Sequence, residues 1–307
     1  MSGLDPIALG VLVGRLRAVC DEMGAVLIRS AHSPNIKERR DCSAALFTPD
    51  GELVMQAEHI PVHLGSMPDA VAAILGEEPE QGKSWILNDP FRGGTHLPDI
   101  TLITPVFNGA DLSGFAATRA HHADVGGPTP GSMPADSRTL EDEGVVIAPQ
   151  LVSGIDELSE LTEGMRNRPQ RLADLRAQWA ANALGERRLS DLIEREGSGD
   201  IAAGMREILE YAERRTRARL EELGDGNWEA RDVLEGGEDG GEDIELCVKA
   251  TISGSGLELD FSGSSDQVGG NLNCPLSVTR SAAFFCVRVL LDPDAPPCAG
   301  AHRPVEV

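Results

Sequence analysis

Two stretches of this sequence combine histidine and aspartate with pairs of glycines. The first begins at Gly93-Gly94 and contains His96 and Asp99, and the second begins at His121 and ends in another glycine pair. Imidazole and carboxylate groups that lie close together can bind a metal ion or transfer protons. Glycine-rich loops after strands often carry such sites because a substrate can approach their backbone. All histidines except His302 lie at or before residue 122, so we expect the chemistry in the N-terminal part.

The elements that must position these side chains are predicted to be strands. Residues 43–48 and 52–57 should form a hairpin, because Thr48-Pro49-Asp50-Gly51 supplies turn residues between two apolar runs. Further strands are expected at 85–87, 100–106 and 114–120. Asp41 would then enter the first strand of the hairpin, and both histidine-containing stretches would follow or border strand ends.

Four of these residues form the predicted metal site. His96 and Asp99 flank Pro98, and we expect Asp41 and His121 to join them from separate strands. Two nitrogen and two oxygen ligands suit Zn, Mn or Fe. The alternative is that each side chain is an ordinary polar group with hydrogen-bond partners at the end of a strand.

Two neighbouring residues are candidate catalytic groups. Because alternate residues of a strand point to opposite faces, His121 and His122 should not both join the metal readily. Asp124 could orient a metal ligand or act as a general base. His122 and Asp124 are therefore the candidate catalytic residues.

Other polar residues near the hairpin could support the site or contact substrate. His59 and His63 would either orient a ligand or simply form hydrogen bonds near the hairpin. Arg39 lies in a basic run close to Asp41, where it could bind an anionic substrate group or form a surface salt bridge. Gly93 and Gly94 would give a substrate access to the site.

Composition excludes several classes of protein. The net charge of −23 argues against a nucleic-acid partner, because phosphate binding requires an excess of Lys and Arg. The sequence has neither a long apolar run nor the pattern of a signal peptide, so we expect no membrane association and a cytoplasmic location. The six cysteines form no CxxC pair and fit reduced thiols.

The remaining sequence predicts an α+β fold with mixed sheets, packed helices and a helical middle segment. A helix is expected at 5–30, where Pro6 suits the first helical position and apolar residues recur at helical spacing. Helices are also expected at 68–75, 172–194, 205–223 and 277–291, a hairpin at 244–261, and an exposed acidic loop at 235–243. The expected units are an α/β metal-site core at 1–150, a helical segment at 151–225, and a β-hairpin and helix at 226–307.

The sequence resembles the hydantoinase B/oxoprolinase family. The resemblance extends over essentially the whole chain and rests on separated motifs: 35–43, 51–67 with His59-Ile60-Pro61-Val62-His63-Leu64-Gly65-Ser66-Met67, 88–99, 119–127, Pro130-Gly131-Ser132, Glu143-Gly144, and Asp260-Phe261-Ser262-Gly263 leading to Asn273 and Thr279. The family comprises B-type subunits of N-methylhydantoinases and ATP-dependent lactamases and part of 5-oxoprolinase, with acetone carboxylase α subunits as relatives. Its members are usually longer, so we expect this chain to be part of a larger protein.

The resemblance implies a divalent metal (Zn, Mn or Fe) on Asp41, His96, Asp99 and His121, the four residues selected above. It also implies an A-type partner subunit that binds ATP, a hetero-oligomer, and a small cyclic amide such as a hydantoin, 5-oxoproline or a lactam as substrate. An ATP site on the partner agrees with this sequence, which has no GxxxxGK[ST] phosphate-binding loop. The alternatives are an acetone-carboxylase-like α subunit and a catalytically silent scaffold subunit.

Overall fold

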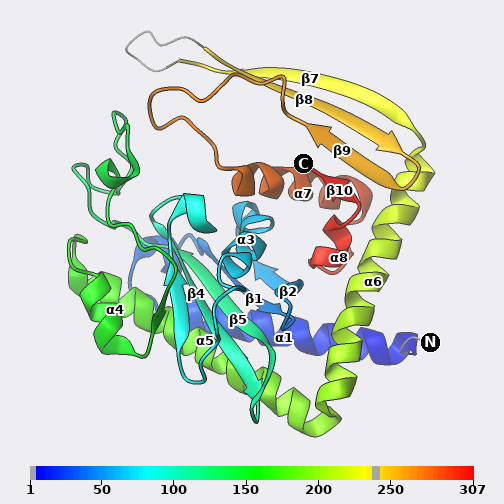
Figure 1. The fold of residues 1–307 in the computed structure, drawn as a ribbon, viewed down its shortest axis with the longest axis horizontal. Helices are drawn as coiled ribbons and strands as arrows, with labels where there is room; N and C mark the ends of the chain where they lie inside the picture. The colour runs from blue at the N-terminus through cyan, green and yellow to red at the C-terminus, as the bar shows by residue number, and fades with distance from the viewer. Residues whose placement is uncertain (1–4, 237–242) are drawn as a thin grey trace.

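The computed structural model describes residues 5–236 and 243–307, which form an α+β fold with two sheets, as predicted (Figure 1). The first sheet has six strands in the order β2-β1-β5-β4-β3-β6, and all neighbouring strands are antiparallel. Its strands are β1 (Cys42–Phe47), β2 (Leu53–Glu58), β3 (Ser84–Leu87), β4 (Asp99–Asn108), β5 (Asp111–His121) and β6 (Gln150–Val152). The predicted hairpin and the three strands after it are confirmed.

Helices cover both faces of this sheet. On one face, α1 (Pro6–Ser30) and α5 (Arg168–Glu196) pack against the strands and each other through apolar side chains of one buried cluster. The other face is covered by η1 (Pro61–His63) and α3 (Ser66–Ala72), and α3 joins the strands in a second apolar cluster. Helix α7 (Leu276–Leu291) packs on η1 and α3. The sheet is therefore buried on both sides, which explains the near-continuous burial of β1, β3 and β4.

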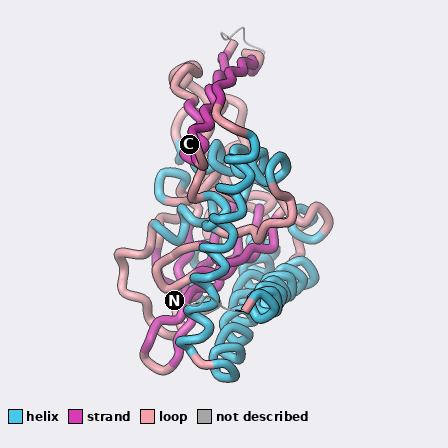
Figure 2. Tube along the Cα trace, turned by 90° about the vertical axis from the view of Figure 1, so that its right-hand side faces the viewer, coloured by secondary structure: helices cyan, strands magenta, loops and turns pink. Residues whose placement is uncertain are grey.

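The second sheet lies beyond α3 and α7 and has the strand order β10-β9-β8-β7 (Figure 1). It consists of β7 (Gly226–Leu234), β8 (Ile244–Ser253), β9 (Gly256–Asp260) and β10 (Val305–Glu306). Helix α6 (Ser198–Leu223) runs along the molecule and leads into β7, and Figure 2 shows these strands extending away from the body. The predicted hairpin 244–261 is confirmed, whereas most of the acidic loop at 235–243 falls outside the described residues.

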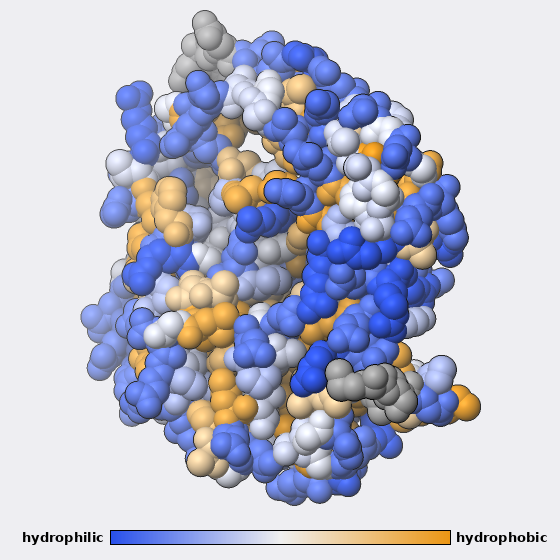
Figure 3. Space-filling view, turned by 45° about the vertical axis from the view of Figure 1, so that its right-hand side comes forward, coloured by the Kyte–Doolittle hydropathy of each residue, from blue (hydrophilic) through white to orange (hydrophobic). Residues whose placement is uncertain are grey.

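Short elements complete the described chain. They are α2 (Pro34–Lys37), η2 (Pro90–Arg92), η3 (Leu140–Asp142), α4 (Ile155–Leu161) and α8 (Ala299–His302). Among the described residues, no helix has the length and apolar character needed to cross a bilayer. Polar residues cover most of the face in Figure 3, with apolar patches between them. The division at residues 150 and 225 stays a prediction.

Candidate metal centre

The pairing of β4 with β5 brings the first three candidate ligands together. Asp99 begins β4 and lies opposite His121, the last residue of β5, so both side chains leave the same face of the sheet. Asp99 Oδ1 lies 3.3 Å from His121 Nδ1, and Asp99 Oδ2 lies 3.1 Å from His96 Nδ1. The two imidazole rings face each other with their centroids 4.9 Å apart. The buried Asp99 carboxylate is thus the centre of the group.

A tight turn fixes His96 relative to Asp99. The Asp99 amide donates to the His96 carbonyl at 3.0 Å, which closes the turn around Pro98. Within the same turn the Thr95 hydroxyl donates to Asp99 Oδ2 at 2.6 Å. The carboxylate therefore has one oxygen held by its own loop, while its buried Oδ1 has no hydrogen-bond partner among the described residues.

Asp41 reaches the group from the segment that leads into β1. Its carbonyl accepts the His121 amide at 3.0 Å, which attaches this segment to the end of β5. Its carboxylate Oδ2 lies 3.9 Å from His121 Nδ1. The side chains of Asp41 and His96 are 22% and 35% exposed, against 2% for Asp99, so the group opens to solvent on their side.

His63 completes the group from η1. Pro61 begins this turn of 3₁₀ helix, which places His63 Nε2 3.5 Å from Asp99 Oδ2. The Ser43 hydroxyl of β1 is hydrogen-bonded to His63 Nδ1 at 2.9 Å. The described residues thus contain two compact sets of possible metal donors that share Asp99: one with His96 and His121, the other with Asp41 and His63.

The charges of the group suit a cation. Burial and repulsion by Asp99 raise the pKa of Asp41, and the nearby histidines only partly offset this. Burial alone would raise the pKa of Asp99, but the charge of His96 and contacts with His121 and His63 hold it well below its usual range. Burial alone would lower the pKa of His96, but the contacts with Asp99 and the charge of Asp41 together raise it above its usual value. A bound cation would relieve the repulsion between the carboxylates and replace the protons on the imidazoles.

Arg119, which was not among the predicted site residues, lies buried behind the group. Its guanidinium donates to the Thr101 hydroxyl at 2.7 Å, the Ser66 hydroxyl at 2.6 Å and the Gly93 carbonyl at 2.8 Å. Burial lowers its pKa to about 10, although the charges of Asp99 and Asp69 oppose this. The sequence signal is a lone arginine among small residues of β5, on the same strand face as His121.

The two candidate catalytic residues have other partners in the fold. His122 points to the opposite face from His121, as alternation predicts, where its Nε2 is hydrogen-bonded to Gln178 of α5 at 2.9 Å. Burial lowers its pKa to about 4. Asp124 accepts from the amides of Gly126 and Gly131, both at 2.9 Å, and pairs with Arg166. It therefore organises the loop after β5.

The other predicted site residues are distributed around the group. The His59 ring lies against α1, with Nε2 2.8 Å from the position a Cβ would take at Gly24, so it does not face the donor sets. Arg39 is exposed on the segment before Asp41. Gly93 has a φ of +94°, and a Cβ there would lie 2.7 Å from the Asp69 carbonyl. This position therefore requires glycine for conformation and for close packing against α3.

An open pocket of about 250 Å³ borders the same glycine pair. Its lining includes Gly93 and Gly94, the exposed ring of Phe91, and Ser277 and Arg280 of α7. The Ser277 hydroxyl donates to the Gly94 carbonyl at 3.2 Å, which ties α7 to the segment carrying His96. The pocket and the donor group therefore share one stretch of backbone.

A model of the hydantoinase B/oxoprolinase family matches residues 5–307. The chain belongs to this family. In an alignment of 337 positions, the chain is 38% identical to 5-oxoprolinase 1 of Arabidopsis thaliana. The alignment covers 99% of this chain and 26% of that protein. The family resemblance expected from the motifs is confirmed.

Two solved structures share the fold of this chain. The ATP-dependent caprolactamase from Pseudomonas jessenii superposes with a TM-score of 0.93 at 30% identity, covering 100% of this chain and 54% of that one. An acetone carboxylase structure superposes with a TM-score of 0.92 at 21% identity, covering 98% of this chain and 43% of that one, which shows a shared fold. This family member therefore spans about half of the caprolactamase chain and about a quarter of the 5-oxoprolinase.

Proposed function

We propose that this chain forms the metal-binding part of a B-type subunit that opens cyclic amides, with an ATP-binding A-type subunit as its cytoplasmic partner. The observation that carries the proposal is the convergence of three imidazoles on the buried Asp99 carboxylate, at 3.1 to 3.5 Å. The names of relatives that open lactam rings support hydantoins, 5-oxoproline or lactams as the substrate class.

Asp41, His96, Asp99 and His121 would hold a divalent cation such as Zn, Mn or Fe. Bound there, the cation would acidify a water molecule or polarise a carbonyl oxygen. Asp99 is prepared for this role because it stays ionised while buried, and Thr95 fixes one of its oxygens. His96 and Asp41 lie on the exposed side, where a substrate carbonyl would approach.

The neighbouring pocket would hold the remainder of the substrate. Its Phe91 ring offers a flat apolar surface for a small ring, and Arg280 supplies a cation beside it. Arg280 is paired with Asp69 at 3.2 Å, so its position is fixed before substrate arrives. Because Gly93 and Gly94 form one wall, a ring can approach close to the backbone that leads to His96.

Activation by ATP is assigned to the partner. The sequence Gly82-Lys83-Ser84 resembles the end of a phosphate-binding loop, but it leads into strand β3, whereas such a loop leads into a helix. The caprolactamase relative is named as ATP-dependent, which supports ATP use by the complete assembly. Phosphorylation of the amide on the partner followed by attack at this metal centre would divide the reaction between the two subunits.

Metal analysis and turnover of the assembled subunits test the proposal. The chain, purified without chelator and mixed with its A-type partner, should contain stoichiometric metal and open 5-oxoproline, a hydantoin or caprolactam only with ATP. His96→Ala should lose metal and activity while keeping its far-UV circular dichroism, and His32→Ala, at an exposed histidine, should keep all three.

Three results would contradict the proposal. Bicarbonate-dependent carboxylation of acetone in place of ring opening would favour an acetone-carboxylase-like subunit. Absence of metal from the active assembly would favour a scaffold subunit. Retained metal and activity in His96→Ala would place the site elsewhere.

A further inference from the structure

His63 lies outside the four-residue ligand set but faces the same space. Its side chain is completely buried, and its Nε2 atom has no hydrogen-bond partner among the described residues. A buried nitrogen without a partner costs free energy unless another group satisfies it. Its Nε2 lies 3.5 Å from Asp99 Oδ2, and a ring nitrogen of His63 lies within 4.8 Å of carboxylate oxygens of both Asp99 and Asp41.

Ser43 fixes the orientation of this imidazole. The Ser43 hydroxyl lies 2.9 Å from His63 Nδ1 and makes no other side-chain hydrogen bond among the described residues. If Nδ1–H donates a hydrogen bond to the Ser43 oxygen, Nε2 carries no proton and its lone pair is directed at the carboxylates. A hydrogen bond to the second ring nitrogen is the usual way in which proteins set the tautomer of a metal-binding histidine.

Several separations in the group are short enough for a single ion, and the donors form two sets that share Asp99. With metal–donor bonds of about 2.1 Å, two donors of one ion lie at most about 4.2 Å apart. His96, His121 and His63 lie 3.1, 3.3 and 3.5 Å from Asp99, and His121 lies 3.9 Å from Asp41. The separation between His63 and Asp99 thus falls within the range of the other pairs.

We propose that His63 Nε2 is a fifth protein ligand of the metal, in the tautomer whose Nδ1–H donates a hydrogen bond to Ser43 Oγ. This inference rests on the proposed metal centre and goes beyond it by changing the donor set to three nitrogens and two oxygens. Five protein donors leave one position of an octahedral ion open for water or the substrate carbonyl. The set therefore favours Mn²⁺ or Fe²⁺ over Zn²⁺, which binds four ligands in most protein sites.

Counting imidazole ligands by X-ray absorption tests this assignment. The full chain is loaded with Mn²⁺ and, separately, with Zn²⁺, and the imidazole contribution to the metal-edge scattering is fitted. We expect three imidazoles in the unmodified protein and two in His63→Ala with Mn²⁺. His32→Ala removes an exposed imidazole outside the group and should keep three.

The Ser43→Ala variant distinguishes metal binding by His63 from the orientation of its ring by Ser43. This variant keeps the His63 imidazole but removes the partner of Nδ1, so the fitted count should stay at three while Mn²⁺ affinity falls by about 10- to 100-fold. His63→Ala should lower the affinity more than Ser43→Ala does. Affinity is measured by competition with a chelating indicator, which needs no substrate.

The outcomes distinguish this inference from the proposed function. Two imidazoles in the unmodified protein, unchanged in His63→Ala, would overturn His63 as a ligand and leave the four-residue centre intact. Failure of both ions to bind stoichiometrically would overturn the metal centre as well. An Mn²⁺ affinity equal in His63→Ala and Ser43→Ala would reduce His63 to a positioning role.

Discussion

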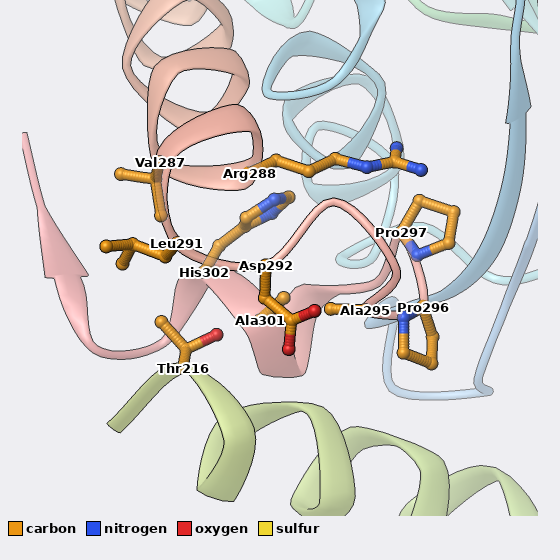
Figure 4. Close-up of a pocket in the computed structure, with 10 residues that line it drawn as sticks. All are labelled: Thr216, Val287, Arg288, Leu291, Asp292, Ala295, Pro296, Pro297, Ala301 and His302. Carbon is orange, nitrogen blue, oxygen red and sulfur yellow. The ribbon is translucent and has the colours of Figure 1, made fainter. Parts of the chain in front are cut away.

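Replacing His302 by phenylalanine should make the protein less sensitive to mild acid. His302 ends α8, and its ring stacks on Phe284 of α7 with centroids 3.9 Å apart and planes 5° from parallel. Figure 4 shows it in a pocket with Asp292 and Arg288. Burial, followed by the charge of Arg288, lowers its pKa from 6.5 to about 4. Phenylalanine keeps the stacking and removes the titration.

The direction of this pH effect on stability follows from proton binding in the folded and unfolded states. The unfolded chain takes up a proton on His302 near pH 6.5, whereas the folded protein resists protonation until about pH 4. The contribution of neutral His302 to the free energy of unfolding is thus fully present above pH 6.5 and is lost as the pH falls toward 4. The full difference amounts to about 3 kcal/mol, of which about 2 kcal/mol is lost between pH 7 and pH 5.

Urea denaturation at pH 7 and pH 5 measures this contribution. The loss of unfolding free energy between the two pH values should be about 2 kcal/mol smaller in His302→Phe than in the unmodified protein. His32→Phe, at an exposed histidine, should behave like the unmodified protein. Equal losses in His302→Phe and the unmodified protein would show that His302 is not kept neutral by burial.

Two further substitutions test the surroundings of the proposed metal centre. Asp124→Asn weakens the hydrogen bonds from the amides of Gly126 and Gly131. This variant should retain metal, turn over more slowly and show faster amide hydrogen exchange in this loop. Loss of metal would instead make Asp124 a ligand. Arg119→Met removes three hydrogen bonds of a buried guanidinium and should lower the free energy of unfolding, measured in urea, by about 3 to 5 kcal/mol. Arg92→Met, at an exposed arginine, should change it by less than about 0.5 kcal/mol, and similar values for both variants would contradict a structural role for Arg119.

Apolar periodicity and turn residues were sufficient to predict most of the first sheet and the long helices. The sequence did not predict strand β7. Most of its residues are exposed on both faces, so its apolar side chains do not alternate with polar ones. The side chains of Asp99 and His121 were expected near strand ends, and the strand pairing places them opposite each other. Which residues bind metal stays a prediction.

The sequence left the roles of His63 and Arg119 unresolved for physical reasons. His63 faces Asp99 only because a single turn of 3₁₀ helix after Pro61 docks on β1, and such tertiary contacts have no local signature. His59, four residues earlier, is directed to α1 instead. A buried arginine in a strand is also unpredictable from local pattern, because its hydrogen-bond partners come from three separate segments.

The pairing of Asp99 with His121 limits which insertions the protein can tolerate. These residues lie at the open end of the β4–β5 hairpin, whose turn at Asn108 and Asp111 is at the far end. A one-residue insertion between Asp99 and Val106 would move Asp99 to the face that α5 covers. The register already shifts between Val106 and Phe107, close to the turn. Changes in length on the turn side of that irregularity can therefore accumulate during evolution without separating Asp99 from His121.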